Sequence, residues 1–200
     1  MNTAEKYILG LKKAYHDNGA DEIWNHFEKV KEGVNSKIIT QLKNLYPEIP
    51  KALVDLLEYV DGTYWRAYQD EEIALYFLGS DIEGYPYYLL SSEQMINNKN
   101  QAAEYYSDYI EREYEEVDID EKITDRTDEL KWLHFSDCMN NGGTSQLFID
   151  FSPSESGKQG QVVRFLHDPD KFSVIAESFE EYLQKLMDNE YEFINEDTLD

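Results

Sequence analysis

The stretch KWLHFSDCMNNGGTSQLFIDF, residues 131–151, decides the fold of this 200-residue chain. Residues 130–135 are mostly apolar or aromatic, as in strands, and the turn formers Asn140, Asn141, Gly142 and Gly143 follow them. After this turn the side chains alternate, which suits a sheet with one face in the core. The alternating sets are Leu147, Ile149 and Phe151 against Gln146, Phe148 and Asp150. The stretch predicts an antiparallel strand pair.

Two further strands are expected on the C-terminal side of this pair. The polar segment 152–160 contains Pro153, Gly157 and Gly160 and leads into residues 161–167, which indicates a second hairpin. A short strand at 174–176 completes the group.

An aromatic hairpin is predicted earlier in the chain. Residues 73–78 and 85–90 are short aromatic and branched runs joined by the loop 79–84. Pro86 cannot donate a hydrogen bond to a sheet ladder, so the second run is expected at a sheet edge or at a bulge.

Helical periodicity dominates the rest of the chain, with apolar residues three and four positions apart. Proline, glycine and serine mark the helix boundaries, since Pro50 suits a first helical position and Gly62 a left-handed terminator. The expected helices are 3–31 with a break at Gly19, 38–46 ending before Pro47, 50–60, a segment opened by a capping box at Ser91 and Gln94, and a closing helix opened by Ser178 and Glu181.

The segment from Glu111 to Glu129 is rich in acidic residues and has little apolar periodicity, so we expect an exposed helical extension or loop there. Strands cluster and are joined by hairpins instead of alternating with helices. The chain is therefore predicted to be α+β, with a mainly antiparallel sheet, N-terminal helices, a helical insert and a closing C-terminal helix.

The charge balance restricts the classes of partner. The chain has 42 acidic and 18 basic residues and a net charge of -24. The negative electrostatic field of such a chain repels phosphate backbones and anionic membrane surfaces, so neither nucleic acid nor membrane is an expected partner. It favours a basic protein, because complementary fields accelerate encounter. The alternative is that acidity only keeps the chain in solution.

Composition also bears on the compartment. Cys138 is the only cysteine, which rules out an intrachain disulfide. Residues 1–13 include Glu5 and lack the apolar stretch of a secretory signal, and no segment has the roughly 20 apolar residues of a bilayer span. We expect a cytoplasmic protein.

Candidate catalytic and metal sites are weak. Cys138 with His134 is the closest nucleophile and base pair, but a lone cysteine beside a strand is usually core. His167, Asp168 and Asp170 could bind a metal, yet Asp168 precedes a proline, as in turns. The acidic run around Asp118 to Glu121 lacks the glycine and spaced glutamate of a calcium loop. We expect no catalytic residue, cofactor or metal.

A protein-binding surface is better supported by the residues. Tyrosine and tryptophan beside acidic residues are typical of protein interfaces, and they gather in the middle third of the chain. Alternate residues flanking the first hairpin are expected to face away from the helices. The predicted partner-binding residues are Tyr64, Trp65, Glu83, Tyr85 and Tyr87.

Several pieces of the chain, in this order, resemble the SMI1/KNR4 family, part of the SUKH superfamily. The pieces are YPEIP at 46–50 with the helix that ends at Asp61-Gly62, WLHFSD at 132–137 with Gly142-Gly143, LFIDF at 147–151, GQVV at 160–163 and AESFEEYL at 176–183. The chain departs from the family at Asp61, where asparagine is common.

The resemblance covers residues 36–187 and suggests three parts. These are an N-terminal helical extension, 1–35, a domain at 36–188 with an acidic insert at about 97–129, and an acidic tail at 189–200, which is expected to fray.

The resemblance also implies a function. Bacterial members of the family are immunity proteins that neutralise toxins, often nucleases, while fungal relatives regulate cell-wall assembly. Neither role needs a catalytic residue. It implies a non-enzymatic protein that binds a cognate, basic toxin domain, or alternatively an intracellular scaffold or regulatory module. The sequence does not indicate an oligomeric state.

Overall fold

A computed structural model describes residues 1–138 and 145–199. The predicted turn at residues 140–143 lies outside them. In chain order the elements are α1 Thr3–Asp17, α2 Asp21–Val30, α3 Ser36–Leu45, α4 Lys51–Tyr59, β1 Arg66–Tyr68, β2 Glu71–Ile73, β3 Tyr88–Leu89, α5 Ser92–Asn97, α6 Gln101–Ile110, β4 Asp118–Ile119, the 3-10 helix η1 Thr127–Glu129, β5 Trp132–Asp137, β6 Ser145–Asp150, β7 Gln161–Leu166, β8 Lys171–Ala176, α7 Phe179–Asp188 and α8 Glu196–Leu199.

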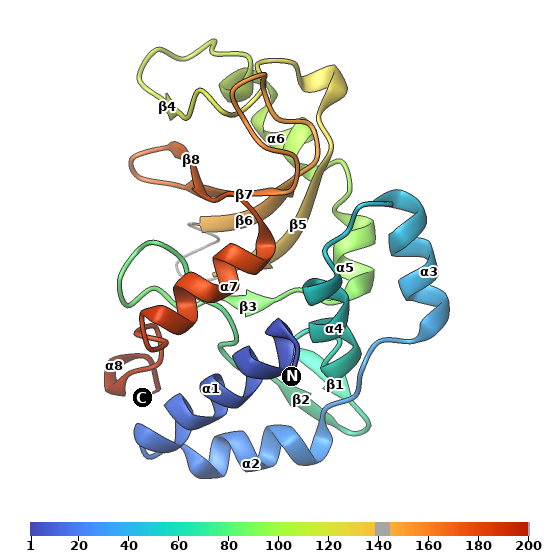
Figure 1. Ribbon diagram of the computed structural model, residues 1–200, viewed down its shortest axis with the longest axis vertical. Coiled ribbons are helices and arrows are strands. Elements are labelled where there is room, and N and C mark those ends of the chain that lie inside the picture. The colour runs from blue at the N-terminus through green and yellow to red at the C-terminus, as the bar shows by residue number, and fades with distance from the viewer. Residues whose placement is uncertain (139–144, 200) are drawn as a thin grey trace.

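A six-stranded sheet in the order β3-β5-β6-β7-β8-β4 forms the centre of the molecule (Figure 1). All neighbouring strands are antiparallel except β4 and β8, which are parallel. The predicted α+β class with a mainly antiparallel sheet and a closing helix is confirmed. The decisive stretch 131–151 supplies β5 and β6, which pair with Leu133 opposite Ile149.

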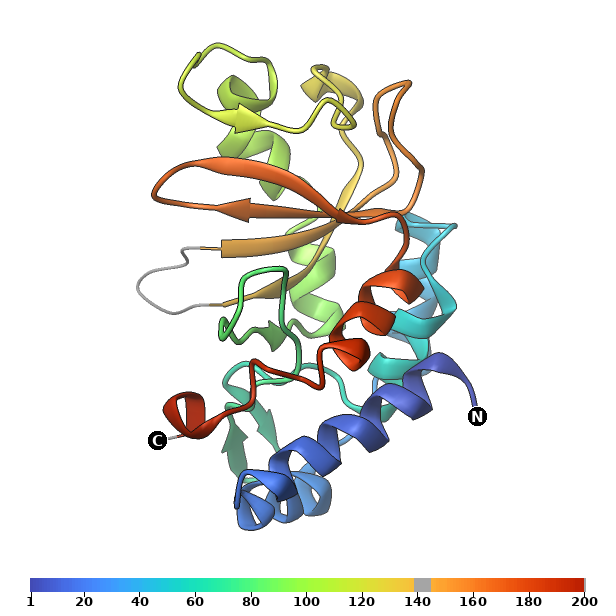
Figure 2. The same ribbon diagram turned by 60° about the vertical axis from the view of Figure 1, so that its left-hand side comes forward.

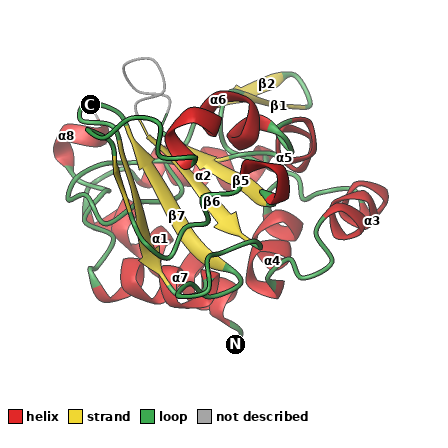
Figure 3. Ribbon diagram, turned by 90° about the horizontal axis from the view of Figure 1, so that it is seen from above, coloured by secondary structure: helices red, strands yellow, loops and turns green. Residues whose placement is uncertain are grey.

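Both faces of this sheet are buried, which differs from the predicted single core face. Every residue of β5 and β6 is buried. Figures 2 and 3 show why, because α6 covers one face and α7 covers the other, with α1 packed behind α7. Phe148, assigned to the polar set of β6, packs beneath α6, where its ring meets those of Trp132 and Tyr106. A second helical layer therefore buries the face that was expected to be solvated.

The N-terminal helices are part of the main core. Asn2 and Glu5 form a capping box that opens α1. Tyr7, Leu11 and Trp24 are fully buried in the same hydrophobic cluster as the α7 face of the sheet. Residues 1–35 and the sheet domain thus share one core.

The first hairpin is only partly as predicted. Leu78 and Tyr87 pair in an isolated antiparallel bridge, and β3 is an edge strand, as Pro86 indicated. Ile73, however, belongs to β2, which forms a separate two-stranded hairpin with β1. The turn between β1 and β2 contains Gln69 at φ +57°, a left-handed conformation that glycine or asparagine usually adopts.

The acidic insert is not simply exposed. Its residues 118–119 form β4 and extend the sheet, and Ile123 is buried in the smaller cluster beneath α6. Arg112 holds this segment against the body, since its guanidinium donates to the carbonyls of Ile123 and Thr124 at 2.9 and 3.1 Å. Buried carbonyls need such donors when no regular pairing reaches them.

The prediction that the C-terminal tail frays is wrong for residues 191–194. Tyr191, Phe193 and Ile194 are buried, and the Tyr191 hydroxyl donates to the carbonyl of Tyr7 at 2.9 Å. Glycine makes room for these rings. A Cβ at Gly10 would lie 2.1 Å from the Tyr191 hydroxyl, and one at Gly79 would lie 2.4 Å from the Phe193 ring.

Gly10→Ala tests this packing through the sign of the change that it causes in the free energy of unfolding. In a helix the change normally stabilises by up to about 1 kcal/mol, but here the clash with Tyr191 should destabilise by about 1–3 kcal/mol. Combined with Tyr191→Ala, which removes the clash, Gly10→Ala should become neutral or stabilising. Urea unfolding of the four proteins measures this cycle. The same effect in both backgrounds would show that Tyr191 does not pack on Gly10 in solution.

Asp150 at the end of β6 gives a pH-dependent stability. It is fully buried, and its carboxylate accepts hydrogen bonds from the Ser152 amide at 2.8 Å and from Gln161 Nε2 at 3.0 Å. Burial outweighs these bonds and raises the pKa from 3.8 to about 6. Between these values the folded state holds more protons than the unfolded state, so stability falls as pH rises.

Asp150→Asn removes this titration. The difference in unfolding free energy, variant minus wild type, should grow by about 2 kcal/mol in total between pH 4 and pH 6, and most steeply near pH 5. Urea unfolding at pH 4, 5, 6 and 7 measures the slope, and a constant offset from the altered hydrogen bonds does not affect it. Parallel pH curves would contradict the raised pKa.

Candidate protein-binding surface

Three half-buried tyrosine rings form a cluster beside the edge strand β3. The Tyr88 ring lies 5.0 Å from that of Tyr64 and 4.8 Å from that of Tyr76. Burial and a hydrogen bond with Tyr76 raise the pKa of Tyr88 well above its ordinary value, so its phenol is neutral. We call Tyr64, Tyr76 and Tyr88 the tyrosine cluster.

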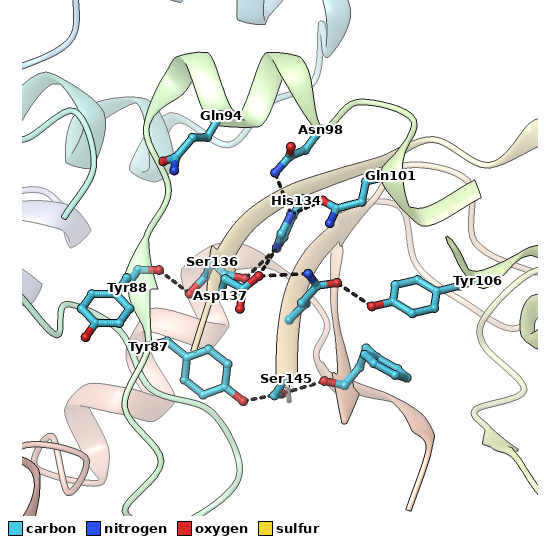
Figure 4. A network of polar contacts seen from close by, with 12 residues as sticks. Tyr87, Tyr88, Gln94, Asn98, Gln101, Tyr106, His134, Ser136, Asp137 and Ser145 are labelled. Carbon is cyan, nitrogen blue, oxygen red and sulfur yellow. Dashed lines mark hydrogen bonds and ion pairs between the residues drawn. The ribbon is translucent and has the colours of Figure 1, made fainter. Parts of the chain in front are cut away.

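β3 is held so that Tyr87 points inward and Tyr88 outward (Figure 4). The Tyr87 hydroxyl donates to Ser145 Oγ at 2.6 Å, and Ser145 Oγ donates to the carbonyl of Phe165 at 2.6 Å. Ser136 Oγ donates to the Tyr88 carbonyl at 2.8 Å. These buried bonds fix the strand to β5, β6 and β7.

Helix α1 supports the cluster from the opposite side. The Tyr15 hydroxyl donates to the Tyr76 carbonyl and the Tyr7 hydroxyl to the Phe77 carbonyl, both at 2.7 Å. Residues 76 and 77 belong to no named strand. Side chains of α1 thus satisfy backbone groups that a regular ladder would otherwise satisfy.

Trp65 lies next to the cluster in the chain and is 59% exposed. Its φ of +43° is a left-handed conformation that costs about 1–2 kcal/mol in a non-glycine residue. The next residue, Arg66, holds the backbone there through ion pairs with Asp61 at 3.1 Å and Glu93 at 3.6 Å. An exposed tryptophan on strained but anchored backbone is a feature that interfaces use.

The contacts of Asp61 explain why an aspartate stands where the family that the chain resembles commonly has asparagine. Its Oδ1 accepts the Ser92 amide at 2.7 Å while Oδ2 receives Arg66, so both carboxylate oxygens are engaged. Asparagine would present an NH2 group in place of one of these oxygens, so it could not accept from both donors at these two positions. A Cβ on the neighbouring Gly62, at φ +91°, would lie 2.7 Å from the Ser91 amide nitrogen.

The predicted partner-binding residues fall into two groups. Tyr64 and Trp65 lie at the tyrosine cluster, whereas Glu83 and Tyr85 belong to the loop before β3. Arg164 fastens this loop through both carboxylate oxygens of Asp81, at 2.5 and 2.9 Å, and Glu83 is exposed on it.

Tyr87 is buried and cannot contact a partner in this structure. The predicted alternation of side chains put Tyr85 and Tyr87 on one outward face. Pro86 and Tyr87 are both buried, however. The alternation therefore breaks at this point, and Tyr88 faces outward instead. Tyr76 was not predicted, because its position depends on the isolated bridge that Leu78 makes with Tyr87, outside any named strand.

Cys138 and His134 do not form a catalytic pair. Cys138 is buried in the larger cluster, while the His134 ring packs on Phe148 at 4.8 Å, in the smaller cluster on the other face of the sheet. Burial lowers the pKa of His134 to about 3, so the ring is neutral near pH 7.

His134 instead joins a buried network that fastens α5 and α6 to the sheet (Figure 4). Its Nδ1 lies 2.7 Å from Gln101 Oε1 and 3.1 Å from Asn98 Nδ2. On the same face, the Tyr106 hydroxyl donates to Gln146 Oε1 at 2.6 Å, and Gln146 Nε2 donates to Asp137 at 2.9 Å. The network holds α6 in place.

The candidate metal residues are engaged within the protein. His167 Nδ1 lies 2.5 Å from Asp170 Oδ1, and Asp118 pairs with Lys171 at 2.6 Å. Asp120 accepts the amides of Lys122 and Val174. Within residues 1–138 and 145–199, no group of three or more His, Cys, Asp or Glu is placed to hold a metal ion.

No helix in the described part of the chain is both long and apolar enough to cross a bilayer.

Comparison with known proteins identifies a family for this chain. No curated protein matches the chain. The model of the SMI1/KNR4 family (SUKH-1) matches residues 33–185, from just before α3 into α7, and so includes the whole sheet and the tyrosine cluster. The chain belongs to the SMI1/KNR4 family.

Proposed function

We propose that this protein is a cytoplasmic immunity protein that neutralises a cognate toxin domain by binding it, without catalysis of its own. Membership of the SMI1/KNR4 family carries the proposal. The net charge of -24 favours a basic partner, as a nuclease-type toxin domain would be.

The contact surface that best fits this role is Trp65 with the tyrosine cluster. Trp65 is exposed and the three tyrosine rings are half-buried. Tryptophan and tyrosine supply large contact area at low entropic cost and are frequent anchors of interfaces. The surface lies outside the two buried cores, and side chains from α1, β5 and β6 fix its backbone. A preorganised surface loses little conformational entropy on binding.

Co-expression with the toxin encoded beside its gene tests the function. The protein should restore growth, and the purified pair should bind in isothermal titration calorimetry. An absence of binding even at low salt would refute toxin neutralisation. A gene neighbourhood without a toxin would favour the scaffold or regulatory role instead.

Trp65→Ala should weaken toxin binding about thirtyfold, equivalent to ~2 kcal/mol, because an interface anchor is removed. The fold should tolerate the change, since the side chain is mostly exposed. Tyr105→Ala is the matched control, because Tyr105 is 73% exposed on α6, over the other face of the sheet. Equal affinity of the two variants would place the interface elsewhere.

Glu83→Lys should reduce the association rate constant several-fold at low salt, with the difference shrinking as salt screens the field. Glu113→Lys makes the same charge change at an exposed position of the acidic insert, which lies at the β4 end of the molecule (Figure 1). Surface plasmon resonance at two salt concentrations compares them. An equal effect of both changes would mean that only the net charge matters, and that Glu83 has no local role.

A further inference from the structure

A groove of about 350 Å³ lies between helix α2 and strand β2. The rear of the groove is apolar, because Phe27, Ile73 and Leu75 are core residues that are at most 5% exposed. Its lining residues are Glu22, Ile23, His26, Phe27, Glu72, Ile73, Ala74 and Leu75.

Exposed apolar side chains border the groove. Ile23 lines the groove on α2 and is 44% exposed, so its apolar side chain is accessible from solvent. Trp65 immediately precedes Arg66, whose partner across the β1–β2 hairpin is Ile73. Trp65 and the groove residue Ala74 therefore flank the same end of this hairpin.

The rim of the groove is acidic. Glu22 and Glu72 line it, and neither has an ion-pair partner within the described residues. Asp21 and Glu71 lie beside them and pair with the imidazoles of His16 and His26, at 2.7 and 2.8 Å. Four carboxylates against two imidazoles give the rim a net negative charge, because Glu22 and Glu72 have no cationic partner among the residues that the structure describes.

Half of this groove is not part of the family domain. Helix α2 ends at Val30, before the family match begins at residue 33, whereas β2 lies within it. The groove is thus formed where an added helix meets the domain. A binding site at such a junction can differ between relatives that share the domain.

We propose that the α2–β2 groove binds an apolar side chain of a basic protein segment, with flanking lysine or arginine side chains at Glu22 and Glu72. The inference rests on the proposed function for the partner, which would be the toxin, and assigns to α2 a role in choosing it. A second copy of this chain fits poorly, because each copy carries a charge of -24 and would repel the other.

A capped pentapeptide with one leucine between two pairs of lysines is a suitable probe. Titrated into ¹⁵N-labelled protein, it should shift the amide signals of residues 21–30 and 71–75, and the same peptide with serine in place of leucine should bind at least tenfold more weakly. Shifts spread over other acidic surfaces, or equal binding of the serine peptide, would overturn the proposal.

Ile23→Glu separates apolar contact from charge. The variant adds a negative charge, so simple attraction of lysine would tighten binding, whereas loss of the apolar contact should weaken it at least tenfold. Leu9→Glu is the matched control, since Leu9 is 52% exposed on α1 and does not line the groove. Amide spectra of the free variants verify the fold. Unchanged affinity of Ile23→Glu would refute the groove as a binding site.

Binding of the toxin to wild type and to Ile23→Glu is a separate measurement. If it binds wild type and Ile23→Glu equally well, the groove proposal fails while the proposed function stands. If the toxin does not bind wild type but the pentapeptide occupies the groove, the proposed function fails and a different basic partner is indicated.

Discussion

The constraint on which the structure depends is that the central sheet is buried on both faces. Every residue of β5 and β6 is enclosed, so polar side chains there must find partners inside the protein. Asp150 meets this need through Ser152 and Gln161, and His134 through Asn98 and Gln101. The same bonds tie separate elements together, so satisfying the polar groups also assembles the fold.

Closure of both faces limits where a partner can bind. Since β5 and β6 are enclosed, a partner must bind at other surfaces, such as the edge strand β3, the β1–β2 hairpin or the added helices. Tyr87 and Tyr88 illustrate the division, since one anchors the edge to the sheet and the next displays an aromatic ring outward. Attachment of the edge and placement of the tyrosine cluster thus involve two consecutive residues.

Periodicity in the sequence predicts the main strands, the helices and their caps, because these patterns reflect burial of each element alone. It does not reveal which element covers which face. The second covered face, β4 and the docked tail all arise from long-range contacts, such as those of Arg112 with Ile123 and of Tyr191 with Gly10. At the candidate site, Trp65 and Tyr64 could be found from composition, whereas Tyr76 and the phase of Tyr87 required the pairing around Pro86.

The acidic residues of the insert and those beside the groove have different roles. The insert that contains β4 lies at one end of the molecule, while α1, α2 and the β1–β2 hairpin lie at the other (Figure 1). The groove is lined by residues of α2 and β2 and so lies at this second end. At physiological salt a charge is screened beyond about 8 Å, so the insert contributes little to the field at the groove. Local acids such as Glu22 and Glu72 must then provide short-range complementarity. Tyr15 connects the groove and the tyrosine cluster, because its ring lies 5.4 Å from Trp24 of α2 and its hydroxyl binds the Tyr76 carbonyl. A partner that engages both would therefore meet surfaces with a common rigid support.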